Sequence, residues 1–283
     1  MSNSLPLVSV IVPIYNSADY VGLCLQSIND QTYGNIELVV VDSERSTDDA
    51  KKVAEKYKAT YFKYGAERSI QRNYGVKKAK GEYVAIIDSD MKLDKKVIAD
   101  CVEVAMKSNS GAVIIPEKSY GEGFWAECKA LERNCYIGDE TIEAARFFLK
   151  SVYTKLGGFN ERMISGEDWD LTVRVRKEGL QVGRVKSLIL HNEGKINLYK
   201  DLKKKLYYAK NADAYLSANA PGLLQTLLFI FRPAYFRNWK MLLSDPIHFV
   251  GFVIMKFLEI FVGGMAIITK KTFWTNLVNI GKV

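Results

Sequence analysis

The sequence has few of the residues on which zinc sites and disulfide frameworks depend. Its 283 residues include only two histidines and four cysteines, and no two cysteines form a C-x-x-C pair or a zinc-ligand spacing. We find no secretory signal pattern at the start, no internal repeat and no low-complexity tract. We therefore expect reduced, buried structural thiols in a cytoplasmic protein: Cys24, Cys101, Cys128 and Cys135.

An excess of positive charge is also lacking in the first two thirds of the chain. Residues 1–194 carry 27 Lys and Arg against 28 Asp and Glu, whereas residues 195–283 carry 13 against 4, a net charge of +9. A domain that wraps nucleic acid would carry the excess on its folded body, so we expect no nucleic-acid partner. The basic last third of the chain instead favours an anionic membrane surface as the binding partner.

Short apolar runs alternate with helical patterns along the first two thirds. The runs are Val8–Val12, Ile36–Val41, Thr60–Tyr64, Tyr83–Ile87, Ala112–Ile115 and Leu188–His191, and helical spacing covers Asp19–Asn29, Thr47–Tyr57, Ser69–Lys80 and a stretch that opens at Gly166. This alternation, without hairpin turns, predicts an α/β fold with a mostly parallel, doubly wound sheet. Ligands of such sheets bind beyond the carboxyl ends of the strands, so residues that follow these runs are site candidates.

The character of the sequence changes after residue 196. We predict an α/β domain over residues 1–196 and a basic, apolar, helical, membrane-associating region over residues 197–283. In the second part, Lys203–Lys205 adjoin Tyr207 and Tyr208, and basic and aromatic groups occur together at headgroup depth.

One long apolar run stands out in that region. Ile247–Ile268 is long enough to span about 30 Å of hydrocarbon, but its charged residues Lys256 and Glu259 would each cost about 2.5–3.5 kcal/mol at the centre. Together with His248 they form a narrow polar stripe on an otherwise apolar helix. We favour attachment in the membrane interface; the alternatives are a span with pairing in a homo-oligomer, and a helix docked on the catalytic domain.

Two carboxylates follow the fourth apolar run directly. Asp88 and Asp90 flank Ser89, and Asp90 can bind a hard divalent cation while Asp88 lies nearer a nucleotide. Such a cation neutralises a pyrophosphate leaving group. A solvated turn is the alternative, because D-x-D patterns are common.

Further polar residues follow other elements. Glu167 and Asp168 begin a helix, where either can cap it or act as general base for an acceptor hydroxyl. His191 ends an apolar run as a structural residue or as a ligand for Mn²⁺ or Mg²⁺. Arg68 and Arg72 share a helical face, where they bind phosphate or pair with surface carboxylates.

Seven short motifs between Leu7 and Gly194 resemble, in order, those of glycosyltransferase family 2 enzymes with a GT-A fold. They are Val8-Ser-Val-Ile-Val-Pro-Ile-Tyr-Asn16, Val39-Val-Val-Asp42 with Ser46-Thr-Asp48, Gln71-Arg-Asn-Tyr-Gly75, Gly81-Glu-Tyr83 leading to Asp88-Ser-Asp90, Gly157-Gly-Phe-Asn160, Gly166-Glu-Asp168 and His191. No single motif decides the matter, but seven in order with sensible spacing form a strong signal.

The resemblance implies a role for each candidate. Asp168 matches the catalytic base, with Glu167 beside it, and Asp90 and His191 match ligands of a divalent metal, Mn²⁺ or Mg²⁺. The residues expected to bind the nucleotide sugar are Pro13, Tyr15, Asn16, Asp42, Arg68, Arg72, Asn73, Asp88 and Ser89.

The sequence also departs from the family pattern. Ser43-Glu-Arg45 replaces a short Asp-Gly turn, which weakens any assignment of the base. The Gln-x-x-Arg-Trp signature of processive synthases is absent after Asp170, which favours transfer of one sugar per encounter. The run Glu143–Phe148 and the basic, apolar tail look like those of enzymes acting on polyprenol-linked acceptors.

We therefore predict an inverting, metal-dependent transfer from a nucleotide sugar to a lipid-linked acceptor at the cytoplasmic face of a membrane. The donor is expected to be UDP-linked, with a GDP-linked sugar as the alternative. The nearest alternative is a polyprenyl-phosphate glycosyltransferase, whose anionic acceptor needs little help from a base. A nucleotidyltransferase ranks lower, because no Gly-rich basic loop follows the first strand. An inactive membrane scaffold is the third reading.

Overall fold

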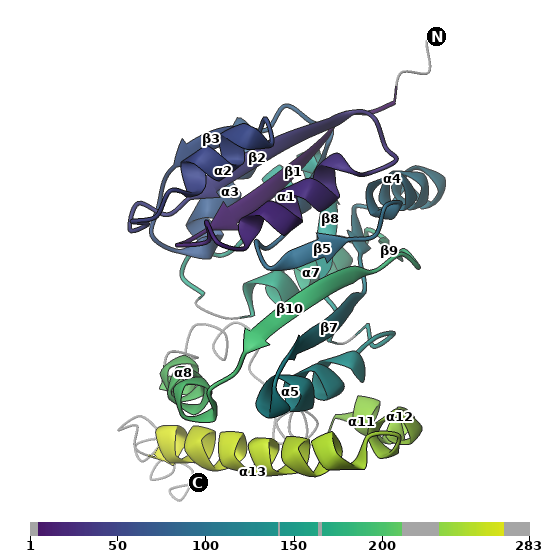
Figure 1. Ribbon diagram of the computed structural model, residues 1–283. Helices are drawn as coiled ribbons and strands as arrows, with labels where there is room; N and C mark the ends of the chain where they lie inside the picture. Colours follow the sequence, from purple (N-terminus) through teal and green to yellow (C-terminus); the bar gives the residue numbers. More distant parts are fainter. Residues whose placement is uncertain (1–4, 141, 164–165, 211–231, 269–283) are drawn as a thin grey trace, which may run out of the picture. The chain divides into compact units, whose positions relative to one another are not determined.

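The computed structural model describes residues 5–140, 142–163, 166–210 and 232–268, and these residues form two compact units (Figure 1). Unit 1 comprises Met1–Lys118, Ile137–Glu161 and Gly166–Asn192, and unit 2 comprises Ser119–Tyr136, Arg162–Ser165 and Glu193–Val283. The described residues of the predicted C-terminal region thus belong to unit 2, together with two segments from the middle of the chain. Residues 211–231 and 269–283 of that predicted region lie outside the described residues.

Unit 1 is built on a seven-stranded sheet with strand order β3-β2-β1-β4-β8-β6-β9. The strands are β1 (Val8–Ile14), β2 (Ile36–Asp42), β3 (Thr60–Lys63), β4 (Tyr83–Ile86), β6 (Ala112–Ile114), β8 (Ala145–Leu149) and β9 (Val182–Arg184). All pairings are parallel except those of β8, which runs antiparallel to both β4 and β6. The predicted mostly parallel α/β sheet is confirmed, and the antiparallel strand at its centre is a feature that we did not predict.

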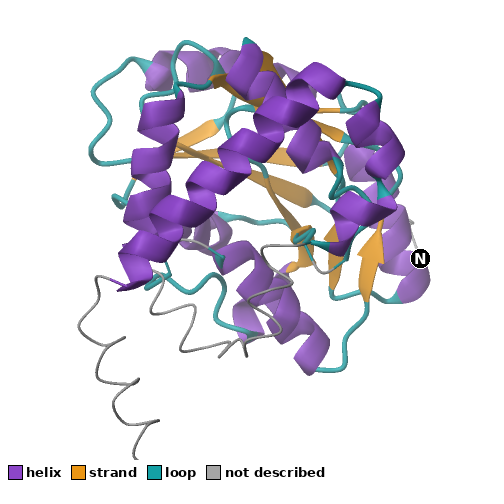
Figure 2. Ribbon diagram, turned by 90° about the horizontal axis from the view of Figure 1, so that it is seen from below, coloured by secondary structure: helices purple, strands orange, loops and turns teal. Residues whose placement is uncertain are grey.

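Helices cover both faces of this sheet, and strands and helices are distinguished by colour in Figure 2. They are α1 (Val21–Asn29), α2 (Ala50–Lys56), α3 (Arg68–Lys78), α4 (Val97–Ser108), α6 (Lys150–Lys155) and α7 (Glu167–Lys177). Val10 and Val12 of β1 pack in one apolar cluster with α1, α2 and α4, whereas Ile11 packs in another with α3, α6 and α7. Successive strand residues point to opposite faces, so a strand buried on both faces is apolar at nearly every position.

Two sequence details fit this central position of β1. Pro13 pairs in register with Val41 of β2. On the other side of β1, the last residue that pairs with β4 is Ile11, two positions before Pro13. A missing backbone N–H is tolerated there because the ladder to β4 has already ended. On α3, a Cβ at Gly75 would lie 2.5 Å from Cγ2 of Ile11, so glycine allows the helix to pack closely on the strand.

A three-stranded sheet has the order β5-β10-β7, with β5 (Met91–Leu93), β10 (Ile189–Lys195) and β7 (Glu117–Glu122). β10 runs antiparallel to β5, so His191 pairs with Met91, the residue after Asp90. β7 continues through Gly121 to Glu122, and a helix begins at Phe124. This strand lacks apolar alternation, so its sequence carries no strand signal.

Unit 2 is mainly helical, with α5 (Phe124–Asn134), α8 (Leu198–Lys210), α11 (Pro233–Arg237), α12 (Trp239–Leu243) and α13 (Pro246–Ile268). α13 packs against α5 and α8. Its Gly251 lies where a Cβ would be 2.4 Å from Sγ of Cys128, so glycine permits this close helix contact. All four cysteines of the chain are free and buried, as expected.

The polar stripe of α13 faces the interior of unit 2. Lys256 Nζ lies 2.6 Å from a carboxylate oxygen of Glu132 and 2.6 Å from one of Glu259, and Lys129 Nζ lies 3.0 and 3.2 Å from oxygens of the same two glutamates. The prediction of a polar stripe is therefore confirmed, and its charged members are paired with α5.

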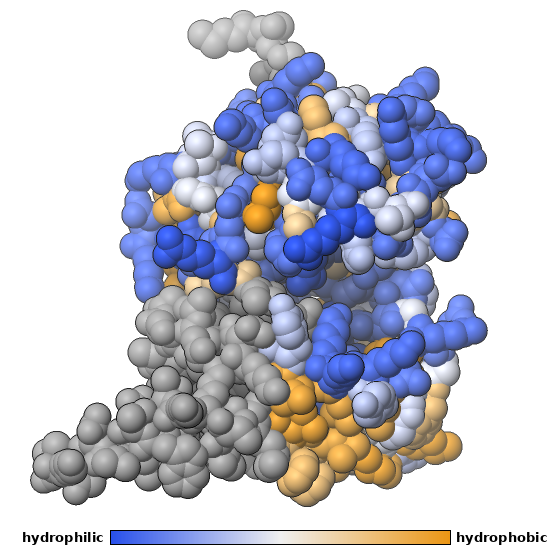
Figure 3. Space-filling model, turned by 90° about the vertical axis from the view of Figure 1, so that its left-hand side faces the viewer, coloured by the Kyte–Doolittle hydropathy of each residue, from blue (hydrophilic) through white to orange (hydrophobic). Residues whose placement is uncertain are grey.

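In contrast to these charged residues, most apolar residues of α13 are exposed. With α11 and α12 they form a surface that we call the apolar face: Phe236, Trp239, Leu243, Ile247, Val250, Val253, Ile254, Phe257, Ile260 and Phe261. An apolar area of this kind is visible in orange in the lower part of Figure 3. Among the described residues, one helix is long and apolar enough to cross a membrane; this 18-residue stretch, Pro246–Gly263, is only 17% buried. Only part of α13 belongs to a core: Phe252 and Met255 are buried in a small apolar cluster of unit 2 with Cys128 and Cys135.

Candidate active site

The candidate site lies in unit 1, where the parallel strands β1, β2 and β4 end on the same side of the sheet. The loops after β1 and β2 are joined by hydrogen bonds: Asn16 N donates to Oγ of Ser46, and Thr47 N donates to Oδ1 of Asn16 at 2.9 Å. Asn16 has a φ of 47°, a left-handed conformation that asparagine tolerates. Residues 47–49 lie outside the helix, and α2 begins at Ala50 and not at Thr47 as predicted.

Two residues of the predicted nucleotide site differ sharply in exposure. Tyr15 is 56% exposed, whereas Asp42 is 1% exposed. Asp42 accepts hydrogen bonds from Ser46 Oγ and from Tyr61 Oη, the latter at 2.7 Å. A direct contact between Asp42 and a nucleotide would therefore require the carboxylate to leave these partners. As it stands, Asp42 supports the loop that follows β2.

Arg72 lies at the centre of a cluster of carboxylate side chains. Its side chain is fully buried and donates to Asp88 Oδ1 at 2.6 Å, to Asp168 Oδ1 at 2.9 Å and to Glu167 Oε1 at 3.1 Å. Burial opposes the charged guanidinium, but these three carboxylates raise the pKa of Arg72 above its ordinary value. Of the two alternatives predicted for Arg72, phosphate binding or pairing with surface carboxylates, the structure shows pairing with carboxylates, but these are buried or half-buried and not at the surface.

A second buried arginine, which sequence reasoning missed, contacts the same cluster. Arg146 on β8 donates from Nη1 to Asp88 Oδ2 at 3.2 Å and from Nε to Glu117 Oε1. Burial would raise the pKa of Asp88, but Arg72 and Arg146 together lower it. The only sequence signal for Arg146 was a charge inside the apolar run Ala145–Leu149.

The predicted metal ligands lie beside each other. His191 Nε2 is 3.5 Å from Asp90 Oδ2, and Asp90 Oδ1 is buried without a hydrogen-bond partner among the described residues. On the other side of the ring, His191 Nδ1 lies 3.5 Å from Oε2 of Glu117. Burial raises the pKa of Glu117, but Arg146 and His191 outweigh it and lower that pKa to about 2.

The chemistry of this cluster fits a divalent cation. Its connected side chains include five carboxylates (Asp88, Asp90, Glu117, Glu167 and Asp168) but only three guanidinium groups (Arg68, Arg72 and Arg146). No group of three or more His, Cys, Asp or Glu side chains forms a metal site within the described ranges. A pair of protein ligands, Asp90 and His191, suits a cation whose other positions are filled by substrate phosphate and water.

Neither carboxylate at the start of α7 caps the helix. The helix N-cap is Gly166, and no side chain caps it. Glu167 is buried, and both burial and the charge of Asp168 raise its pKa against Arg72 and Arg68. Asp168 is the most exposed carboxylate bound by Arg72, at 30% of its side chain, so it is the one that a substrate can reach.

The remaining predicted residues occupy varied positions. Arg68 is 55% exposed at its side chain, with Nη2 3.7 Å from Glu167. Ser89 Oγ lies 3.4 Å from Oγ of Ser17, and Pro13 is buried in β1. Asn73 binds the backbone of Phe159 through both side-chain groups, so it supports the turn after α6.

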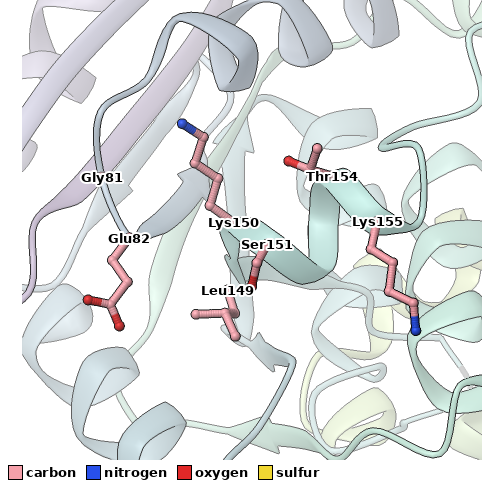
Figure 4. Close-up of a pocket in the computed structure, with 7 residues that line it drawn as sticks. All are labelled: Gly81, Glu82, Leu149, Lys150, Ser151, Thr154 and Lys155. Carbon is pink, nitrogen blue, oxygen red and sulfur yellow. The ribbon is translucent and has the colours of Figure 1, made fainter.

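A shallow hollow elsewhere in unit 1 is not part of this site. It is lined by Gly81, Glu82, Leu149, Lys150, Ser151, Thr154 and Lys155, at the beginning of β4, whereas Asp88 follows its end. Figure 4 shows that Glu82, Lys150 and Lys155 point in different directions and do not converge on a ligand. Lys150 Nζ in fact binds the backbone oxygen of Ala79.

Comparison with solved structures gives the same fold. The chain is similar to Staphylococcus aureus TarS 1–349 in complex with UDP, with a TM-score of 0.55 and 21% identity over 72% of this chain and 65% of that one. It is also similar to the mannosyltransferase PcManGT of Pyrobaculum calidifontis in complex with GDP-Man and Mn²⁺, with a TM-score of 0.58 and 18% identity over 99% of this chain and 80% of that one. The GT-A-like fold is thereby shown.

Comparison of sequences gives the family. The chain is 31% identical to the glycosyltransferase GlyG of Streptococcus pneumoniae serotype 4 over 123 residues, 41% of this chain and 40% of GlyG. It is 42% identical over 193 residues to an uncharacterized glycosyltransferase of Rickettsia felis, 60% of this chain and 31% of that protein. The chain covers less than two thirds of the length of these curated relatives. The model of glycosyl transferase family 2 matches residues 9–156, which include Asp88, Asp90 and Arg72. The chain belongs to glycosyl transferase family 2.

Proposed function

We propose that this chain is an inverting, metal-dependent glycosyltransferase that moves one sugar from a UDP-linked donor to a lipid-linked acceptor at the cytoplasmic face of a membrane. The observation that carries the proposal is the binding of Asp88 and Asp168 by one buried guanidinium, that of Arg72. This guanidinium connects Asp88, at the strand end where ligands bind in this kind of sheet, with Asp168 at the start of α7.

A nucleotide-sugar donor is supported by the site and by the relatives. TarS is described in complex with UDP and with UDP-GlcNAc, and PcManGT in complex with GDP-Man and Mn²⁺. In this chain the exposed ring of Tyr15, next to Asn16, is available to a base, and Ser89 lies next to Asp88. We assign Asp42 and Asn73 supporting roles beneath this surface, because their side chains are engaged in the bonds described above.

The metal would be held by Asp90 and His191 together with phosphate oxygens of the donor. When bound, it neutralises the charge that develops on the nucleoside diphosphate leaving group. The buried, unpartnered Oδ1 of Asp90 and the excess of carboxylates over guanidinium groups support this assignment.

Asp168 would act as the general base in a direct displacement. Arg72 holds its Oδ1 at 2.9 Å and so fixes the carboxylate, which is exposed enough to accept the proton of an acceptor hydroxyl. One displacement from the face opposite the leaving group inverts the anomeric centre. The raised pKa of Glu167 and its buried position suit a supporting role beside Asp168.

The membrane part of the proposal rests on unit 2. The charged residues of α13 are paired inside the unit, and the apolar face is exposed next to the basic helix α8, whose Lys203 and Lys204 are exposed. A helix with this arrangement lies in the interface, with its apolar side towards the lipid tails and basic groups near anionic headgroups. This favours interfacial attachment over a membrane span.

A polyprenyl-phosphate acceptor is the second candidate, favoured by the same basic and apolar surface of unit 2. Its phosphate is already anionic, so it needs little general-base help. The replacement Asp168→Asn separates the two: it cripples transfer to a hydroxyl far more than transfer to a phosphate.

Screening of donors by thermal shift tests the proposal directly. A bound ligand stabilises the fold by RT ln(1+[L]/Kd), about 2.7 kcal/mol at a hundredfold excess over Kd. We expect a UDP-sugar to raise the Tm in the presence of Mn²⁺ and much less in EDTA. Stabilisation by no nucleotide sugar, or equal stabilisation with and without metal, contradicts the donor or the metal assignment respectively.

A further inference from the structure

The imidazole of His191 lies between two carboxylates, that of Asp90 in the turn before β5 and that of Glu117 on β7. Nε2 faces Asp90 Oδ2 and Nδ1 faces Glu117 Oε2, each at 3.5 Å. A histidine binds a cation through a ring nitrogen that carries no proton, and the partner of the other nitrogen decides which one that is. The position of one ring proton therefore determines whether His191 can act as a metal ligand towards Asp90.

Glu117 is built into the site as a hydrogen-bond acceptor. Its Oε1 accepts from Nε of Arg146, and the carboxylate side chain is 27% exposed. An ionised carboxylate can only accept, and both carboxylates face a ring nitrogen at the same distance. Glu117 is the one fixed by a buried arginine, whereas the side chain of Asp90 is 41% exposed and is the candidate cation ligand, so the nitrogen opposite Oε2 is the one that keeps the proton. Nδ1 of His191 occupies that place, which leaves the lone pair of Nε2 directed to the side of Asp90.

Arg146 ties this acceptor to the strand end that bears Asp88 and Asp90. Its Nη1 donates to Asp88 Oδ2 at 3.2 Å and approaches the backbone oxygen of Ile86 at 3.4 Å. The antiparallel pairing that sets Phe147 opposite Ala85 brings its neighbour Arg146 to this place. Strands β4, β7, β8 and β10 thus contribute one residue each to this arrangement: Ile86, Glu117, Arg146 and His191.

We propose that Glu117 is a positioning residue that keeps the proton of His191 on Nδ1 and so presents Nε2 to a divalent cation, with Arg146 holding Glu117 in place. The cation part rests on the proposed metal dependence, whereas the position of the ring proton does not. Sequence reasoning assigned no role to either residue.

The ring proton can be observed directly, since the chain has only two histidines. We would record a long-range ¹H–¹⁵N spectrum of metal-free protein labelled with ¹⁵N-histidine, in alkaline buffer, and identify His248 with the variant His248→Gln. We expect the proton of His191 on Nδ1 in the wild-type protein. A proton on Nε2 overturns the proposal, whether or not the protein binds metal, and this measurement needs no variant of Glu117 to fold.

Affinity for Mn²⁺ tests the consequence independently of turnover. Glu117→Gln should weaken Mn²⁺ binding, followed by the electron paramagnetic resonance signal of the free ion, by about 10–100-fold. His191→Ala should weaken it at least as much, and the double variant no more than His191→Ala alone, because both changes remove one ligand. The control is Glu122→Gln, the same change at an exposed position of β7, which should bind Mn²⁺ like the wild type.

The outcomes separate this inference from the proposed function. If the wild type binds Mn²⁺ and Glu117→Gln binds it equally well, the inference is wrong and the proposed metal dependence stands. If the losses in Mn²⁺ affinity caused by Glu117→Gln and by His191→Ala are fully additive in the double variant, Glu117 acts through stability or general charge. The positioning role is then overturned. If the wild type does not bind Mn²⁺, the metal dependence and the cation part of the inference both fail.

Discussion

Arg72 and Asp168 are 96 positions apart in the sequence and 2.9 Å apart in the fold, joined by Nη1 of the buried guanidinium and Oδ1 of the carboxylate. The same guanidinium binds Asp88 and Glu167. A single fully buried cation therefore holds α7, which carries the candidate base, against the strand end that carries the D-x-D pair.

Replacing Arg72 by methionine should strongly destabilise the protein. Removal of one partner of a buried ion pair leaves uncompensated charge, which typically costs 3–5 kcal/mol, and here three carboxylates lose their partner. We expect a loss of about this size in the free energy of unfolding, measured with urea. The control Lys155→Met removes an exposed ion pair with Glu178 and should cost about 0–1 kcal/mol. Equal effects of the two changes would show that the buried cluster contributes little.

Asp168→Asn should lower kcat far more than donor affinity, because a base acts in the transition state and not in donor binding. The expected loss is about 10²–10⁴-fold, measured by steady-state kinetics with a hydroxyl acceptor. Asp170→Asn is the control: Asp170 pairs with Arg174 on the same helix, so its loss should affect stability more than kcat. A variant at Asp168 that melts early but retains full specific activity would show that this residue is structural.

Asp90→Ala should abolish metal-dependent turnover while the protein stays folded. The reason is that Asp90 Oδ1 forms no hydrogen bond within the described structure, so little native stabilisation is lost with it. The measurements are the rate with added Mn²⁺ and the Tm, with the exposed Asp49→Ala as the matched control. Full activity of the variant in EDTA-treated buffer would show that Asp90 is not a metal ligand.

The stability of unit 2 should fall in acid because of Glu132. Burial raises the pKa of Glu132, but Lys129 and Lys256 outweigh it and hold that pKa well below 4.5. The folded state thus binds fewer protons than the unfolded state, so this contribution to stability is complete above about pH 4.5 and is lost as the pH falls.

Urea unfolding at a series of pH values measures this effect. For one proton, the free energy of unfolding changes by up to about 1.4 kcal/mol per pH unit. Glu132→Gln should lower stability near pH 7 and flatten the decline below about pH 4.5. A decline as steep as in the wild type would mean that Glu132 does not contribute to it.

Attachment to lipid should depend on the apolar face. We expect the wild-type protein to float with anionic liposomes at low salt, and Phe257→Glu, at a position 71% exposed, to weaken flotation strongly. Leu23→Glu makes the same kind of change at a 65% exposed position of α1 in unit 1 and should float like the wild type. Replacement of Lys203 and Lys204 should reduce binding by about 1 kcal/mol for each lysine, more at low salt. A wild-type protein that stays in the soluble fraction would rule out membrane attachment.

Much of unit 1 followed from local pattern. Strands buried on both faces must be apolar at nearly every position, so β1, β2 and β4 are legible in the sequence, and the residues after them are known as soon as the strands are known. The polar stripe of α13 is also a local property, because it depends only on helical periodicity.

Other features depend on pairings between distant segments, which no local pattern encodes. β7 is polar and half-exposed, β8 enters the sheet against the direction of its neighbours, and Arg146 on β8 looks in the sequence like an interruption of an apolar run. Only the tertiary structure brings Arg72 and Arg146 to opposite oxygens of Asp88 and places Glu117 behind His191. The sequence by itself determined the parallel strands β1, β2 and β4 and the carboxylates at their ends; the fold decided which buried cations hold those carboxylates, because a buried charge is stable only where distant partners meet it.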